Sequence, residues 1–297
     1  MTAAGYPAVV APIQWWHWIP CIGGRSMRPI IERIDHAIDQ LLASGFSQQP
    51  LPAPAYTLID LLSDFRSNPG GVLKVGGSQD PSEYPNIEPC GDEFTVAARE
   101  RRREAAISAG GPGTRVTLVG HSAAGWIARI YLSGVPYSGR KYDGNRKVHS
   151  LVCLGSPHFP AKSLAFDALR YLEKQAGGSL PPQTVRCLCV GSSGTPLAGA
   201  SDMTRGAYEM CGANPDDGGL QGDGMTPLFS ALAFEGADQL VVEDVSHAPE
   251  YPAWGPSAEL AKRRQDGQPW YGSRGILERW LPWLTVPQDW PNTSKRS

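Results

Sequence analysis

The feature that most constrains the fold of this chain is the turn around Ser122, where an apolar run passes through small residues into a helical pattern. The residues before it, Val116–Val119, are strand-like, and the apolar residues after it recur at helical spacing as far as Tyr131. Gly134 and Pro136 then indicate where that helix ends. The stretch therefore predicts a strand, a sharp turn and a helix, with Ser122 at the apex of the turn.

A serine in this position is typical of a nucleophile. The turn projects the hydroxyl into a cleft, while the helix N-terminus and a backbone N–H face the developing oxyanion. The usual pattern is Gly-x-Ser-x-Gly, and here Ala124 stands in place of the second glycine. A methyl group is tolerated there if the local φ is negative, and Gly125 keeps the start of the helix slim. A chance match in a buried turn is the structural alternative.

Size and charge limit the classes of protein to consider. With 297 residues, 41% hydrophobic residues and a formal net charge of −2, the chain predicts one large α/β domain over residues 1–297 and no nucleic-acid partner. The basic stretch Arg99–Arg103 includes Glu100 and is followed by Glu104, which indicates a solvated helix face. No apolar run approaches the roughly 18 residues that a membrane-spanning helix needs. No targeting segment is visible at the start of the chain.

The six cysteines give no metal signature. Cys153, Cys187 and Cys189 lie in strand-like apolar runs, where a free thiol behaves as a small hydrophobic group. Cys21 and Cys90 lie in predicted loops, where they could pair. No pair has CxxC spacing, so the sequence predicts no metal and no cofactor.

Apolar runs alternate with helical patterns along the chain, which predicts a mostly parallel central sheet flanked by helices. The expected strands are Ala8–Ala11, Tyr56–Leu62, Val116–His121, Val148–Leu154, Val185–Val190 and Gln239–Val245. The expected helices are Ile30–Ala43, Ala123–Ser133 and Ile276–Leu284. Glycine-rich and proline-rich stretches around residues 63–113 and 191–224 predict loop or cap insertions, where substrate pockets and lids are often built.

A serine nucleophile needs a histidine base, and an acid that orients the histidine. Where the serine lies on such a turn, the acid and the histidine follow it in the chain, and the histidine comes after the last strand. His247 meets that condition. His17 and His36 precede the serine, with His36 expected on an exposed helix face. His158, at the end of the strand Val148–Leu154, could line the pocket, although a hydrogen bond to loop backbone is the simpler expectation.

The acid is expected after the strand Val185–Val190. Asp223 stands out there because glycines flank it and Pro227 follows, so its carboxylate can turn inward. An Asp that bonds only its own turn backbone is the alternative. Asp202 is a further candidate, and Asp216 with Asp217 is the rival pair, in a stretch without the spacing of a calcium loop.

The remaining parts of the predicted site are backbone and aromatic groups. The N–H of Ala123 and a second N–H near Ile13 or Gln14 are expected to form the oxyanion hole. Trp15, Trp16 and Trp18 follow at once. They suit the wall of an apolar pocket, or transient docking on a lipid surface, and packing beneath Trp280 and Trp283 is the alternative.

Taken together, these motifs resemble a lipase-like α/β-hydrolase branch of plants, algae and cyanobacteria, which is distantly similar to GPI-inositol-deacylase-like hydrolases. The resemblance covers most of the chain, and its most specific parts are the turn at Ser122 and the Gly222-Asp-Gly segment. The other parts are Val9–Pro12, Asn68–Gly71, Val75–Ser78, Leu154–His158 and Val245–His247. It implies an α/β-hydrolase fold and a metal-independent triad of Ser122, Asp223 and His247.

What the resemblance implies about substrate is broader. Members resemble carboxylesterases, lipases and chlorophyll-dephytylating esterases, so a hydrophobic ester, such as a lipid acyl or phytyl ester, is the expected substrate. Plant chlorophyllases usually have Gly-His-Ser-x-Gly-Gly at this turn, from which Ala124 departs. A non-catalytic binding protein for an apolar small molecule and an acyltransferase using the same residues are the alternatives. The expected location is the cytoplasm, or the plastid stroma if a targeting peptide is missing.

Overall fold

The structure is a computed structural model that describes residues 8–13, 17–18, 26–43, 115–138, 140–176, 185–248 and 268–285. The chain divides into two compact units. Residues 1–116, 130–148 and 292–297 form the first, and residues 117–129 and 149–291 form the second. None of the helices in the described ranges is both long and apolar enough to cross a membrane.

The first unit contains α1 (Arg28–Ala43), the last residues of α5 (Ala123–Leu132) and the short α6 (Gly144–Lys147). Isoleucines recur along α1 and are buried, but so are five polar residues of the same helix: Glu32, Arg33, Asp35, His36 and Asp39. The prediction that His36 lies on an exposed face is therefore wrong, because nearly the whole circumference of this helix is covered.

Polar and charged side chains within the first unit bind the acidic residues of α1. Lys147 Nζ lies 2.8 Å from Asp35 Oδ1 and 2.5 Å from Asp39 Oδ1. Tyr142 donates a hydrogen bond of 2.8 Å to Glu32. Burial would lower the pKa of Lys147, but the two aspartates raise it overall and keep the ammonium charged.

The second unit is built on a four-stranded sheet in the order β1-β2-β3-β6. Its strands are β1 (Val116–His121), β2 (Val148–Leu154), β3 (Arg186–Ser192) and β6 (Asp238–Val242). The strand β3 pairs in parallel with β2 on one side and with β6 on the other. The apolar runs of β2 and β3 are buried almost throughout, as expected for central parallel strands.

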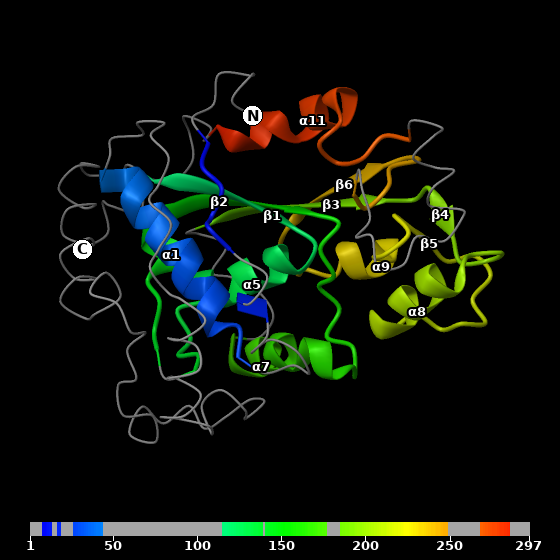
Figure 1. Ribbon diagram of the computed structural model, residues 1–297, viewed down its shortest axis with the longest axis horizontal. Helices are drawn as coiled ribbons and strands as arrows, with labels where there is room; N and C mark the ends of the chain where they lie inside the picture. The colour runs from blue at the N-terminus through cyan, green and yellow to red at the C-terminus, as the bar shows by residue number, and fades with distance from the viewer. Residues whose placement is uncertain are drawn as a thin grey trace. The chain divides into compact units, whose positions relative to one another are not determined.

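Helices cover both faces of this sheet (Figure 1). On one face lie α11 (Arg274–Trp280) and the 3₁₀ turn η6 (Leu281–Leu284), which bury Trp280 against Val190 and Val242. The first turns of α5 and the helix α7 (Asp167–Ala176), which follows the 3₁₀ turn η5 (Leu164–Phe166), lie on the other. The predicted α/β class with a mostly parallel sheet is therefore confirmed.

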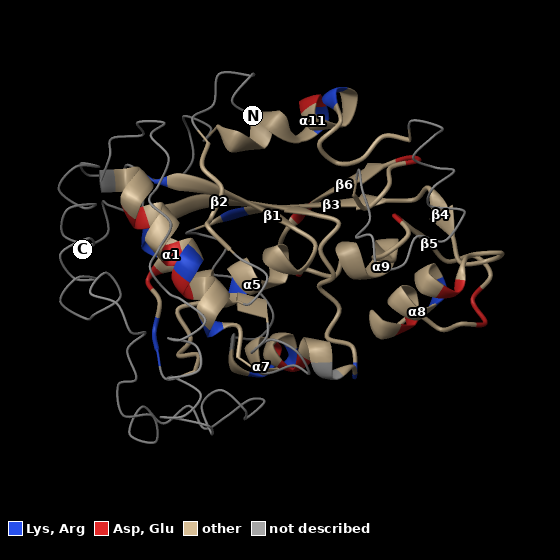
Figure 2. Ribbon diagram, in the orientation of Figure 1, with Lys and Arg blue, Asp and Glu red and all other residues tan. Residues whose placement is uncertain are grey.

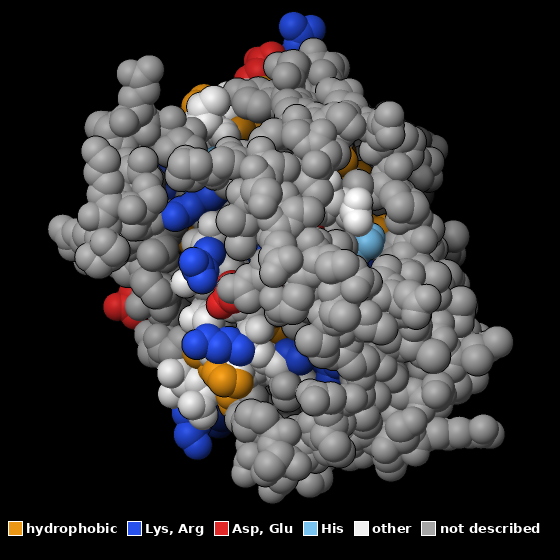
Figure 3. All heavy atoms as spheres, turned by 90° about the vertical axis from the view of Figure 1, so that its left-hand side faces the viewer, with side chains coloured by type: hydrophobic (Ala, Val, Ile, Leu, Met, Phe, Trp, Pro, Cys, Tyr) orange, Lys and Arg blue, Asp and Glu red, His pale blue; other side chains and the backbone are white. Residues whose placement is uncertain are grey.

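The predicted insertion at 191–224 has structure of its own. It holds β4 (Thr195–Pro196), α8 (Asp202–Met210) and β5 (Gln221–Gly222), and the two short strands pair antiparallel. The helix α9 (Leu228–Ala231) follows. Acidic and basic residues lie on α1, α7, α8 and α11, and the central strands are mostly uncharged (Figure 2). On the face shown in Figure 3, Lys and Arg side chains of the described residues reach the surface.

Three expected strands differ from the structure. The strand expected at Val185–Val190 begins at Arg186 and continues to Ser192 as β3. Ala8–Ala11 is not a strand, and Val10, 92% exposed, packs against little. The last strand ends at Val242 rather than Val245, because Asp244 turns the backbone at a φ of 52°. The expected strand Tyr56–Leu62, the insertion at 63–113, Arg99–Arg103, Cys21 and Cys90 lie outside the described residues.

Candidate active site

Ser122 lies at the strand-to-helix turn that the sequence predicts. It follows β1 directly, has a φ of 56°, and precedes α5, which begins at Ala123. Its N–H donates a hydrogen bond of 3.0 Å to the carbonyl of Leu154, which fixes the turn to the end of β2. A non-glycine residue in the left-handed region is strained, so the surrounding contacts must hold this conformation.

Two glycines make room for the turn. A Cβ on Gly120 would lie 2.7 Å from the backbone nitrogen of Gly125, and a Cβ on Gly125 would lie 2.1 Å from Ser156 Oγ. Alanine can replace the usual second glycine only where φ is negative. Ala124 meets this condition, since it is not among the residues with positive φ. The backbone of α5 approaches the neighbouring strand most closely one residue later, at Gly125.

Asp223 is held by the turn that its flanking glycines form. Its carboxylate Oδ1 accepts hydrogen bonds from the N–H groups of Met225 (2.9 Å) and Thr226 (2.7 Å), while Gly224 has a φ of 98°. Thr226 Oγ1 in turn donates to the carbonyl of Gly155, at the end of β2. Asp223 therefore accepts hydrogen bonds from its own turn, which was the alternative to a catalytic role, but it uses only one of its two carboxylate oxygens to do so.

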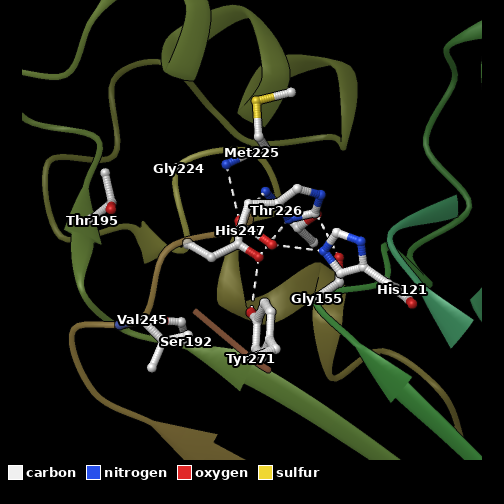
Figure 4. Close-up of polar contacts among 12 residues, drawn as sticks. His121, Gly155, Ser192, Thr195, Gly224, Met225, Thr226, Val245, His247 and Tyr271 are labelled. Atoms are coloured by element: carbon white, nitrogen blue, oxygen red, sulfur yellow. Dashed lines mark hydrogen bonds and ion pairs between the residues drawn. The ribbon is translucent and has the colours of Figure 1, made fainter. Parts of the chain in front are cut away.

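The second oxygen of Asp223 faces His247. His247 Nδ1 lies 2.8 Å from Asp223 Oδ2, and the backbone N–H of His247 donates to the carbonyl of Asp223 at 3.0 Å. Asp223 is completely buried, and His247 is 7% exposed. Figure 4 shows the polar contacts around His247, with His121 and Tyr271 beside it. Because Nδ1 carries the proton of this bond, Nε2 is the nitrogen left to accept a proton.

Tyr271 is a further partner of this pair, and no pattern in the sequence predicts it. Its hydroxyl donates a hydrogen bond of 2.8 Å to Asp223 Oδ2, the oxygen that His247 also contacts. A bridge between Ser246 and Trp270 sets the two segments side by side, just before His247 and Tyr271. The contact joins residues 48 positions apart through a long connection, so no local motif could have predicted it.

The charges in this cluster shift the pKa values. Burial would raise the pKa of Asp223, but the charge of His247 and hydrogen bonds from His247, Thr226 and Met225 lower it overall. Burial, and to a smaller extent the negative charge of Asp223, raises the pKa of Tyr271 well above its usual value. Asp223 is therefore a carboxylate, and Tyr271 a neutral donor to it.

His121 connects the serine turn to His247. Its Nε2 lies 2.7 Å from the carbonyl oxygen of His247, and the two imidazole rings are 4.6 Å apart between centroids. Burial, and then the proximity of His247, lowers the pKa of His121 to about 4. His121 is therefore neutral and donates a hydrogen bond from Nε2 to the backbone of His247. Because His121 directly precedes Ser122, this bond ties the serine turn to His247. Among the described residues no hydrogen bond joins Ser122 Oγ to His247.

The structure also places several other residues that the sequence proposes for the site. Ala123 is the first residue of α5, where a helix leaves its N–H groups without intrahelical partners. Asp202 is the first residue of α8, and Asp216 and Asp217 are exposed, so none of them takes the place of Asp223. Ile13 and Trp18 belong to the first unit, and Trp18 is 36% exposed. Gln14, Trp15 and Trp16 lie outside the described residues.

His158 does not use its ring as expected. Its backbone N–H donates to the carbonyl of Ser230 at 2.7 Å, but both ring nitrogens are buried without an oxygen or nitrogen partner. The ring instead groups with the thiols of Cys153 and Cys189, a set of atoms that could hold a metal ion. Linear spacing could not reveal this set, because pairing of β2 with β3 brings the two cysteines together.

Comparison with known proteins adds no assignment. The chain matches none of the protein-family models, and a search of curated proteins finds no similar sequence.

Proposed function

We propose that this protein is a serine hydrolase of the α/β-hydrolase type that cleaves a hydrophobic carboxylic ester through an acyl-enzyme. The observation that carries the proposal is the buried Asp223–His247 pair, with a 2.8 Å contact between carboxylate and imidazole, tied through His121 to the turn that presents Ser122. The order of the three residues in the chain is the order expected of such hydrolases.

In the proposed reaction, His247 Nε2 accepts the proton of Ser122 Oγ while that oxygen attacks the ester carbonyl. The N–H of Ala123, at the positive end of α5, donates to the oxyanion. His247 then gives the proton to the leaving alcohol, and water releases the acid by the same steps in reverse. Asp223 holds the tautomer and stabilises the imidazolium. The hydrogen bond from Ser122 to His247 forms when substrate is bound, as is common for catalytic contacts that are loose in the free enzyme.

The test is labelling and turnover by matched variants. Wild-type protein, Ser122→Ala and the control Ser193→Ala, a partly exposed serine after β3, are treated with a fluorophosphonate probe and then assayed. The substrates are p-nitrophenyl esters of graded chain length, together with chlorophyll as a phytyl ester. We expect Ser122→Ala to abolish labelling and to lower kcat/KM by about 10⁴-fold or more, with Ser193→Ala unchanged.

The outcomes separate the alternatives. Wild-type protein that is neither labelled nor active would contradict the proposal and favour a non-catalytic binding protein for an apolar small molecule. Ester formation with an added alcohol at the expense of hydrolysis would identify an acyltransferase using the same residues. The preferred chain length, or cleavage of chlorophyll, would define the substrate.

A further inference from the structure

Three side chains that the proposed reaction does not use converge inside the second unit. They are Cys153 on β2, Cys189 on β3 and His158 in the loop after β2, and their sulfur and nitrogen atoms all lie within 4.8 Å of one another. All three residues are at most 1% exposed. A Cβ on Gly125 would lie 3.2 Å from Cys153 Sγ, which places the cluster beneath the first turn of α5.

The fold fixes each member independently. Cys153 and Cys189 are direct register partners in the parallel pair β2–β3, so the sheet sets their separation. His158 is held by the hydrogen bond from its N–H to Ser230 and by its ring contact with Phe234, 5.3 Å between centroids. The three groups are therefore preorganised, and little rearrangement is needed to bring them to a common centre.

The ring of His158 is the anomaly that points to a ligand. It is completely buried, and neither of its nitrogens has an oxygen or nitrogen partner; the polar group that the ring interacts with is the thiol of Cys189. Buried polar groups are normally paired, because leaving one unpaired forfeits its hydration without compensation. A cation bound at one ring nitrogen would supply the missing partner.

We propose that Cys153, His158 and Cys189 bind a Zn²⁺ ion. Two thiolates and one imidazole are ligands that Zn²⁺ prefers, and a three-residue set leaves one coordination position for a further small ligand. The cluster contains no carboxylate, which argues against Mg²⁺ and Ca²⁺. Two thiolates neutralise the divalent charge, so the complex suits a buried position. Each thiol that is protonated beforehand releases its proton to solvent as its Zn–S bond forms, and a thiol that is already a thiolate binds without releasing one.

The consequence is structural. An ion at this place would join β2, β3 and the loop after β2, directly below the turn that presents Ser122. The inference is independent of the proposed hydrolysis, since its test measures metal and not turnover.

The experiment uses the untagged full chain, reduced and stripped with a chelator that is then removed. Co²⁺ is added as a spectroscopic probe, followed by Zn²⁺ in competition. We expect one Co²⁺ per chain with thiolate charge-transfer absorption, displaced by Zn²⁺. Cys153→Ala, Cys189→Ala and His158→Gln should each weaken binding by more than about a hundredfold, because even groups that only orient metal ligands are worth about 10–100-fold. Cys187→Ala and Cys211→Ala, two other buried free cysteines, serve as controls that keep wild-type binding.

A wild-type measurement guards against variants that fail to fold. Adding Zn²⁺, but not Mg²⁺, to metal-free wild-type protein should raise the thermal midpoint. No charge-transfer band, no rise in the midpoint, or equal binding by ligand and control variants would overturn the proposal. Retention of Cu⁺ instead of Zn²⁺ would overturn the assignment to zinc, and so would a disulfide between Cys153 and Cys189 in the purified protein.

Discussion

At the scale of single residues, the carboxylate of Asp223 is the most heavily bonded group of the candidate site. Two backbone N–H groups, the hydroxyl of Tyr271 and the imidazole of His247 all donate to it. A buried carboxylate is tolerated only when it is paired in this way. Asp223 and His247 could be named from chain order and glycine flanks, whereas Tyr271 and His121 could not, because their contacts depend on how distant segments meet.

Replacing Tyr271 by phenylalanine tests how much the hydroxyl contributes. Tyr271→Phe keeps the ring in the core and removes one donor to a buried charge, so we expect the free energy of unfolding to fall by about 1.5–3 kcal/mol. Urea denaturation measures the change. In an Asp223→Asn background the same substitution should cost much less, because the acceptor no longer carries a charge. An equal cost in both backgrounds would show that the hydroxyl acts through other contacts.

At the scale of secondary-structure elements, β1, the first turn of α5 and the end of β2 form one packed unit around Ser122. The bounds of β1 and β2 follow from their apolar runs and were predicted residue for residue. Sequence periodicity could not predict the structure inside residues 191–224, where strands of two residues leave no pattern. It could not predict the Cys153–Cys189 contact either, because strand register is a property of the assembled sheet.

Two glycine substitutions should have opposite effects on stability. Gly125→Ala places a Cβ 2.6 Å from Ser156 Cβ, so we expect a loss of about 1–3 kcal/mol from overpacking. Gly206→Ala, within α8, meets no atom within 4 Å and should gain about 0.5–1 kcal/mol through helix propensity. Thermal and urea unfolding of both variants measure the difference. Ser156→Gly should restore part of the loss in Gly125→Ala, and no restoration would place the strain elsewhere.

At the scale of the whole molecule, His121 and Asp223 link folding to pH. The pKa of His121 is lowered to about 4 in the folded chain, against about 6.5 for an unperturbed histidine. Between these values the unfolded chain binds a proton at this residue and the folded chain does not, so the free energy of unfolding falls as the pH falls. Asp223 acts in the same direction at lower pH, because its pKa is also lowered.

Acid sensitivity should therefore depend on His121. Below about pH 4 the full loss is reached, and the shift from about 6.5 to about 4 corresponds to at most about 3 kcal/mol, since one pKa unit is worth about 1.4 kcal/mol. His121→Gln keeps an N–H donor for the carbonyl of His247 but cannot titrate. Urea denaturation of both proteins at a series of pH values from 4 to 8 should show that the free energy of unfolding falls more steeply in the wild type below pH 6.5, while the two slopes coincide above pH 7.

Parallel slopes throughout would mean that His121 is protonated in the folded chain, and that the contact with His247 does not hold it neutral. Because the other five histidines are present in both proteins, the difference between the two curves isolates His121, which ties the Ser122 turn to the Asp223–His247 pair.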